Sequence, residues 1–197
     1  MRQRQLTEEP QNQDIRALTL DTALRLFTEK GFFNTSMQDI RKDADVSIGS
    51  IYHYFKSKES LAQALYHDLV GRFEKAVEEI MLRHGSTHDR ARAVTLFLLE
   101  MAENSPQGIQ FLFCAKHREF LPCEKPICAS RPFELIRDIV ATGIERGELC
   151  ELNPVVATAS LFGGVIRLIH LKLDGALEGS LPDYFDQIWQ CAWASVT

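Results

Sequence analysis

A short segment near the N-terminus, residues 46–58, combines aromatic side chains that carry polar tips with basic side chains and contains no acid. Tyr52, His53 and Tyr54 stand in a row, and two lysines follow them. Tyrosine, histidine and lysine can donate hydrogen bonds to phosphate oxygens and to base edges. The whole chain carries a formal net charge of −5. A segment without acids is therefore a local feature, typical of an anion-binding surface.

Two short helices joined by a tight turn are expected to carry this segment. Apolar residues recur along the chain at intervals of three and four, which indicates helices. Thr35 and Gln38 have the spacing of a capping box, which predicts a helix over residues 38–44. Ser47 is expected to cap a second helix over residues 48–55. This arrangement predicts a helix-turn-helix, whose second helix enters the major groove of DNA.

The second of these helices is expected to have an inner and an outer face. Ile51 and Phe55 lie four residues apart and are predicted to pack inward with Val46 and Ile40. The residues left facing outward are Gly49, Ser50, Tyr52, His53 and Tyr54. Spacing alone leaves two interpretations open, a DNA-binding motif or a packed helix hairpin with ordinary surface tyrosines.

The order of several motifs favours DNA binding. Residues 19–61 contain LFTEKGF, then TSMQDI, then VSIGSIYHYFKSKESL. This segment resembles the N-terminal domain of the TetR family of bacterial transcriptional regulators. The resemblance implies a homodimer with two helix-turn-helix heads on a palindromic double-stranded DNA operator. It also implies C-terminal domains that dimerise and bind a small-molecule effector, which releases a repressor from its operator.

The resemblance further implies which residues meet DNA. By position, Gly49, Tyr52 and residue 48 face bases. The residues expected to face phosphates are Thr35, Ser36, Ser50, His53, Tyr54 and Lys58, and Gln38 completes the predicted DNA-binding set. Many members of the family carry a polar residue where this chain has Ile48. Because isoleucine cannot donate to guanine, Ile48 is expected either to contact a thymine methyl group or to pack inward.

The remaining pattern predicts an all-α fold of about nine helices. The first is expected over residues 14–30, with Gly31 as its C-terminal cap. The fourth is expected over residues 58–84, with Ser57 as its N-terminal cap. Prolines at the first helical position mark later starts. These prolines are Pro106, Pro154 and Pro182.

We expect two domains, a helix-turn-helix domain over residues 1–57 and an effector-binding and dimerisation domain over residues 58–197. Charge is unevenly spread between them. Residues 1–58 hold 9 Lys/Arg and 8 Asp/Glu, whereas residues 59–197 hold 13 and 19. The first part is therefore the expected partner of a polyanion. A charged arm containing Arg2 and Arg4 is interpreted either as a minor-groove contact or as a disordered tail.

The effector pocket is expected among aromatic and sulfur-containing side chains of the second domain, most of which also serve the core. Its candidate residues are Phe73, Val77, Phe97, Met101, Phe111, Cys114, His117 and Phe133. No cofactor is expected other than this unidentified effector.

The dimer interface is expected on the last two helices. Residues 155–173 form the most apolar long stretch, but Arg167, His170 and Lys172 argue against a membrane span and for a buried helix. Arg167 is expected to meet an acid of the second copy, an anionic ligand or solvent. The predicted interface consists of Phe162, Gly163, Gly164, Arg167, Ile188, Trp189 and Ala192.

One cluster of cysteines suggests an alternative regulator. Cys114, His117, Cys123 and Cys128 have the spacing C-x2-H-x5-C-x4-C. They are interpreted as free thiols, as a zinc site or as a redox sensor whose thiols are activated by nearby basic residues. A metal- or redox-sensing regulator is therefore the second hypothesis.

Catalysis is not expected. The chain lacks a Gly-x-Ser-x-Gly motif, a glycine-rich phosphate loop and a His-Glu-x-x-His motif. A helical enzyme or scaffold is the remote alternative. The N-terminus has no apolar signal sequence, and five cysteines suit a reducing compartment, so a cytoplasmic location is expected.

Overall fold

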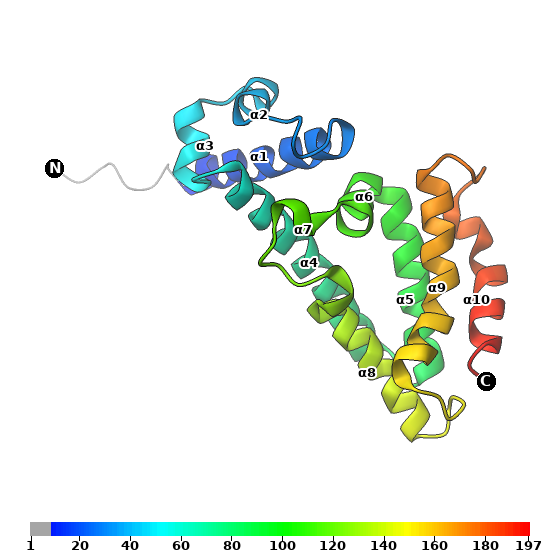
Figure 1. The fold of residues 1–197 in the computed structure, drawn as a ribbon. Coiled ribbons are helices and arrows are strands. Elements are labelled where there is room, and N and C mark those ends of the chain that lie inside the picture. The colour runs from blue at the N-terminus through cyan, green and yellow to red at the C-terminus, as the bar shows by residue number, and fades with distance from the viewer. Residues whose placement is uncertain (1–8) are drawn as a thin grey trace. The chain divides into compact units, whose positions relative to one another are not determined.

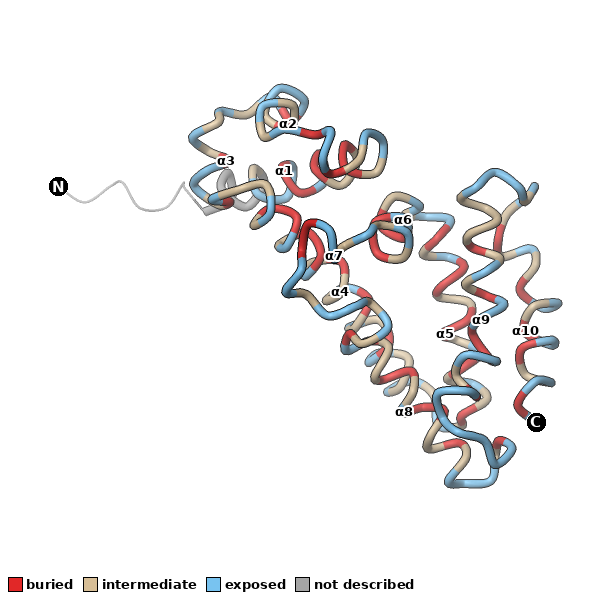
Figure 2. The backbone as a smooth tube through the Cα atoms, in the orientation of Figure 1, coloured by how far each residue is buried: buried red, intermediate tan, exposed pale blue. Residues whose placement is uncertain are grey.

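A computed structural model describes residues 9–197, and all regular structure in this part of the chain is helical (Figure 1). It contains ten α-helices and two short 3-10 helices, which confirms the prediction of an all-α fold. Arg2 and Arg4 lie outside the described residues. Buried residues recur at intervals along the helices, as Figure 2 shows, so each helix buries one side.

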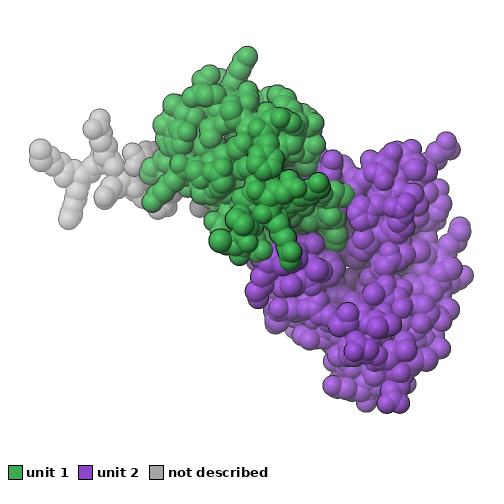
Figure 3. All heavy atoms as spheres, in the orientation of Figure 1, with its two compact units in different colours: residues 1–69, 111–124 green, residues 70–110, 125–197 purple. Residues whose placement is uncertain are grey.

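Packing divides the chain into two compact units (Figure 3). Unit 1 comprises the residues up to 69 together with residues 111–124. Its elements are α1 (Glu9–Glu29), α2 (Met37–Ala44), α3 (Ile48–Tyr54), the start of α4 (Lys58–Arg83), the end of α6 (Pro106–Cys114) and α7 (His117–Phe120). The core of this unit contains Leu26, Ile40, Ile51, Leu61 and Phe111, all of which are almost completely buried.

Unit 2 comprises residues 70–110 and 125–197. Besides the remaining parts of α4 and α6 it holds α5 (Thr87–Asn104), η1 (Ile127–Ala129), α8 (Arg131–Glu145), α9 (Pro154–Leu173), η2 (Leu181–Tyr184) and α10 (Phe185–Ala194). Helix α5 packs against α8, α9 and α10, and α9 packs against both α8 and α10. The core contains Phe73, Leu98, Leu99, Ile136 and Ile139.

Most helix boundaries follow the expected signals, although α1 begins at Glu9 rather than at residue 14. Gly31 adopts a left-handed conformation (φ +85°) after α1, as a C-terminal glycine cap does. Helices α6 and α9 begin at Pro106 and Pro154 as predicted. Pro182, however, lies in η2, and α10 begins only at Phe185. The grouping into units also differs from the sequence boundary after residue 57, because residues 111–124 pack with the N-terminal helices. The functional domain boundary stays a prediction.

Helix α9 differs from the expected buried helix. It is the one helix of the described chain whose length and hydropathy suit a membrane span, but only 28% of that window is buried. The inward side carries Ala157, Leu161, Phe162, Val165 and Ile169. Small and apolar residues on the opposite side are exposed. Within one chain, therefore, only one side of this predicted buried helix is covered.

We expect a methyl group at Gly143 to disrupt unit 2. A Cβ atom there would lie 2.5 Å from Thr87 Cγ2 and 3.0 Å from Leu149 Cδ1. Gly143→Ala should therefore lower the free energy of unfolding by about 1–3 kcal/mol through overpacking. Gly71→Ala is the matched control, because no atom lies within 4 Å of its Cβ position in α4. This change should raise the free energy of unfolding by up to about 1 kcal/mol. Thermal unfolding followed by circular dichroism measures both, and equal effects would contradict the packing described for Gly143.

Candidate nucleic-acid interface

Helices α2 and α3 form the predicted helix-turn-helix. Asp45 links them in a left-handed conformation (φ 51°), which reverses the chain after α2. The Ser47 hydroxyl caps α3 by accepting the Ser50 N–H at 3.0 Å. Ile51 and Phe55 are buried, as is Ile40 of α2. The predicted inner face of α3 is therefore confirmed.

The cap of α2 lies one residue later than predicted. Ser36, not Thr35, is the N-cap, and its hydroxyl accepts the Asp39 N–H at 3.1 Å. The Asp39 carboxylate in turn accepts the Ser36 N–H at 2.8 Å. The Ser36 hydroxyl also donates to this carboxylate at 2.6 Å, and this bond together with the one from the Ser36 N–H lowers the pKa of Asp39. The sequence also fits this register, because Ser36-x-x-Asp39 has the capping-box pattern, so choosing Gln38 over Asp39 was wrong.

The buried position of Thr35 has a physical cause. Thr35 is only 1% exposed, and its hydroxyl donates to the carbonyl oxygens of Gly31 at 2.9 Å and Leu26 at 3.2 Å. Both carbonyls belong to the end of α1 and its cap. Because this hydroxyl is used inside the fold, the Thr35 side chain cannot serve as the predicted phosphate contact.

Lys58 also has an internal role that the sequence did not indicate. Its ammonium group donates to the carbonyl oxygens of Phe32 and Thr35, both at 2.8 Å. It also lies 4.2 Å from the centre of the Phe32 ring, close enough for a cation–π interaction. Lys58 therefore ties the start of α4 to the turn between α1 and α2, and the predicted phosphate contact at this residue competes with that role.

The outer face of α3 presents most of the expected DNA-binding residues. Tyr52 is 49% exposed, and Gly49 and His53 are exposed as well. Tyr54 is half-buried, and its ring lies edge to face with that of His53 at 5.0 Å. Ile48 is half-buried, so neither of its two predicted positions is excluded.

Gly49 has no partner inside the chain that requires a glycine. A Cβ atom at this position would meet only Ser47 Oγ, at 3.8 Å, which is an ordinary contact. A glycine in a helix costs about 1 kcal/mol relative to alanine. Packing inside the chain therefore does not explain a glycine at this position.

Several polar side chains beside this face are paired within the protein. Asp43 of α2 forms an ion pair with Arg25 of α1. Gln38 is exposed and accepts a hydrogen bond from Arg41 Nε at 3.1 Å. Ser50 shares a hydroxyl–hydroxyl hydrogen bond of 2.8 Å with Ser47. Lys42 of α2 and Lys56 after α3 are exposed cations in this region and can reach phosphates.

The predicted effector residues do not gather in one unit. Phe73, Val77, Phe97, Met101 and Phe133 belong to unit 2, whereas Phe111, Cys114 and His117 belong to unit 1. In unit 2 the ring of Phe73 packs against those of Phe97 at 5.6 Å and Phe133 at 5.7 Å. In unit 1 the ring of His117 packs against Phe111, and burial lowers the pKa of this histidine.

The predicted dimer residues also separate into two sets. Phe162, Trp189 and Ala192 are buried inside the protomer, so these side chains serve its own core. Gly163, Gly164 and Arg167 are exposed, and Ile188 is half-buried. Gly164 allows α10 to approach α9, because a Cβ atom there would lie 3.1 Å from Ile188 Cδ1.

The cysteine segment forms no assembled site. Cys114, Cys123 and Cys128 are exposed and form no disulfide bond. Among the described residues, no group of three or more His, Cys, Asp or Glu side chains is arranged to hold a metal ion. Nothing in this geometry supports the redox- or metal-sensing alternative.

Known proteins resemble this chain in its N-terminal part and in its fold. Residues 20–65 match the family described as bacterial regulatory proteins, tetR family. The probable HTH-type transcriptional regulator YttP of Bacillus subtilis is 29% identical over 96 residues, 48% of this chain and 46% of that protein. The uncharacterized HTH-type transcriptional regulator YuxN of Bacillus subtilis is 44% identical over 54 residues, 26% of this chain and 19% of that protein. The match thus spans less than half the length of either relative.

Solved structures share the fold over almost the whole chain. The transcriptional regulator FadR from Bacillus subtilis, in complex with stearoyl-CoA, has a TM-score of 0.79 at 19% identity. The similarity covers 92% of this chain and 99% of that one. At this identity the likeness establishes the all-helical architecture, not the ligand.

Removing the ammonium group of Lys58 should destabilise unit 1. Lys58→Met leaves the Thr35 carbonyl without the donor that Lys58 provides, so we expect the free energy of unfolding to fall by about 1–3 kcal/mol. Lys56→Met is the control, because Lys56 is exposed and surface changes stay within roughly 0.5 kcal/mol. Urea titration followed by circular dichroism compares the two variants. Equal stability would show that the Lys58 hydrogen bonds contribute nothing to the fold.

Proposed function

Because residues 20–65 match the tetR family of bacterial regulatory proteins, we propose that the chain is a ligand-responsive transcriptional regulator of this family. It acts as a homodimer that represses genes by binding a palindromic DNA operator, and a small molecule releases it. The proposal includes a cytoplasmic location and no catalytic activity. The observation that carries it is the exposed, acid-free face of α3, where Gly49 has no internal packing reason.

In the proposed complex, α3 lies in the major groove. Tyr52 contacts a base edge, and Gly49 lets the helix backbone come close to the DNA. His53, Tyr54 and Ser50 face phosphates, together with Ser36 at the start of α2. Since the structure gives the Lys58 ammonium group an internal role, Lys42 and Lys56 are the better candidates for phosphate contacts from lysine.

The homodimer is supported by the exposed side of α9. Val155 is 63% exposed, and the residues that follow it on this side at intervals of four are Ala159, Gly163 and Arg167, all exposed. Small side chains let two helices approach closely. A second copy of this helix would bury the apolar part of the surface that one chain leaves in water.

For the effector, we propose an apolar or amphipathic small molecule that enters the core of unit 2 beside Phe73, Phe97 and Phe133. The aromatic character of these side chains supports this choice. FadR from Bacillus subtilis has been solved with stearoyl-CoA, which makes stearoyl-CoA the first compound to test for release of the protein from DNA.

Gly49→Ala separates DNA binding from folding. The added methyl group has room inside the protein and should stabilise α3, but it would lie against the DNA backbone. We expect affinity for a duplex selected from random sequences by the wild-type protein to fall roughly tenfold or more, a loss of about 1.4 kcal/mol. Fluorescence anisotropy measures the binding. Gly71→Ala, a glycine change with equal room in α4, should leave affinity unchanged, and full affinity of Gly49→Ala would contradict the proposed role of α3.

A charge on the exposed side of α9 should break the dimer. Ala159→Glu leaves the protomer folded because Ala159 is exposed, but it would bury an unpaired carboxylate between two copies, at a cost of roughly 3–5 kcal/mol. Sedimentation velocity should show a monomer. Leu82→Glu is the control, since Leu82 is 87% exposed on α4 and this change should leave the dimer intact. A dimer that persists in Ala159→Glu would exclude this face as the interface.

A further inference from the structure

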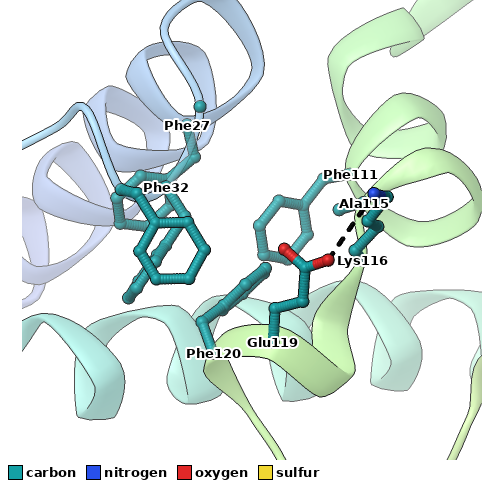
Figure 4. A pocket seen from close by; sticks show the side chains of 9 residues that line it. Phe27, Phe32, Phe111, Ala115, Lys116, Glu119 and Phe120 are labelled. Atoms are coloured by element: carbon teal, nitrogen blue, oxygen red, sulfur yellow. Dashed lines mark ion pairs between the residues drawn. The ribbon is translucent and has the colours of Figure 1, made fainter.

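A hollow of about 230 Å³ lies within unit 1 itself, apart from the outer face of α3. Its walls come from the end of α1, the turn that follows, the end of α6 and α7. Five phenylalanines line it: the largely exposed Phe33 and four buried ones, Phe27, Phe32, Phe111 and Phe120. Figure 4 shows the rings of Phe32, Phe111 and Phe120 arranged around a common space. No role in the function proposed above requires this hollow.

The walls of the hollow are held in place by their own packing. The ring of Phe32 stacks on that of Phe120 with 4.3 Å between centroids. The ring of Phe27 lies 5.2 Å from Phe32 and 6.4 Å from Phe111. All four side chains are buried in the protein around the hollow. The space is therefore preformed, so a ligand would enter it without first reordering these rings.

The rim of the hollow carries one pair of opposite charges. Lys116 Nζ lies 3.5 Å from the Glu119 carboxylate, and both side chains are largely exposed. Because these charges offset each other, the rim offers no net charge that could compensate a charged group on a ligand. The rim therefore favours a neutral molecule over a charged one.

We propose that this hollow is a binding site for a small, neutral ring compound. An apolar cavity of roughly 150 Å³ binds benzene, so the larger volume here suits a fused two-ring system of the size of indole. The aromatic lining offers faces and edges against which such a ring packs in offset or edge-to-face geometry. A polar group on the ring can point toward the Lys116–Glu119 pair.

Binding at this site would affect the conformation of the helix-turn-helix, because the hollow adjoins the turn that precedes α2. Phe32, which lines the hollow, also supplies one of the two carbonyl oxygens that hold Lys58. A ligand that packs against Phe32 stabilises the conformation of this turn and of α2 after it. By linkage, any change in DNA affinity caused by the ligand equals the change in ligand affinity caused by DNA. The site itself does not depend on the DNA-binding proposal.

The test uses the full chain without DNA, so its outcome is independent of the proposed function. 5-Fluoroindole is titrated with protein and followed by fluorine NMR, with 5-fluoroindole-2-carboxylate as the charged counterpart. We expect saturable binding of the neutral compound and roughly tenfold weaker binding of the carboxylate. Absence of saturable binding, or equal affinity for the two compounds, would overturn the proposal.

A pair of variants locates the binding site. Ala115 lines the hollow, so Ala115→Leu should fill part of it and weaken 5-fluoroindole binding roughly tenfold or more. Ala17→Leu, at an exposed position of α1, should leave binding unchanged. Undiminished binding in Ala115→Leu would place the ligand elsewhere. Should Ala115→Leu fail to fold, nuclear Overhauser effects from bound 5-fluoroindole to ring-labelled phenylalanines of the wild-type protein decide the same question, and their absence would exclude the hollow.

Discussion

The ammonium group of Lys58 joins the start of α4 to the turn that leads into the helix-turn-helix. It reaches from the start of α4 to the carbonyl oxygens of Phe32 and Thr35 in the turn between α1 and α2. Thr35 anchors the same turn to the end of α1 through its buried hydroxyl. Since α2 begins immediately after this turn, its direction, and with it that of α3, depends on these few polar contacts rather than on apolar packing alone.

These internal hydrogen bonds bear on the roles predicted for Thr35 and Lys58 in DNA binding. The resemblance to the TetR family implies phosphate contacts at Thr35 and Lys58, yet the polar side-chain atoms of both residues donate hydrogen bonds to backbone carbonyl oxygens. A buried carbonyl that loses its donor costs more free energy than the hydrogen bond itself contributes. In the proposed complex, contact with DNA is therefore assigned to the exposed side chains of α3 and to Lys42 and Lys56, while Thr35 and Lys58 stabilise the turn before α2.

The two units differ in how they bury their apolar side chains. Unit 1 gathers phenylalanines around a hollow that its own residues line. In unit 2 the half-buried rings of Phe97 and Phe133 pack against the buried ring of Phe73, but one side of α9 is left exposed. An exposed apolar helix face is unfavourable in water, so a second copy of the chain explains it better than an isolated protomer does. The glycines of α9 fit a contact with a second copy, but they also fit packing within one protomer, because Gly164 lets α10 of the same chain approach α9.

Local signals in the sequence were sufficient for the helices and for the outer face of α3. Capping residues, prolines at helix starts and apolar intervals act over three to four residues, and they predicted α2, α3 and the burial of Ile51 and Phe55. The predicted capping box of Thr35 with Gln38 was wrong. It overlaps in the sequence with the pair Ser36 and Asp39, and the backbone geometry shows that the second pair forms the cap.

Only the tertiary structure decided the remaining roles. Lys58 lies 26 and 23 residues from its two carbonyl partners, and the hollow joins phenylalanines from α1 with others from α6 and α7. The sequence also could not show that Phe162, Trp189 and Ala192 are buried within one protomer while Gly163 and Arg167 are not. Periodicity identifies which residues share a helix face, but which neighbour covers that face depends on contacts between distant segments, and no local pattern encodes them.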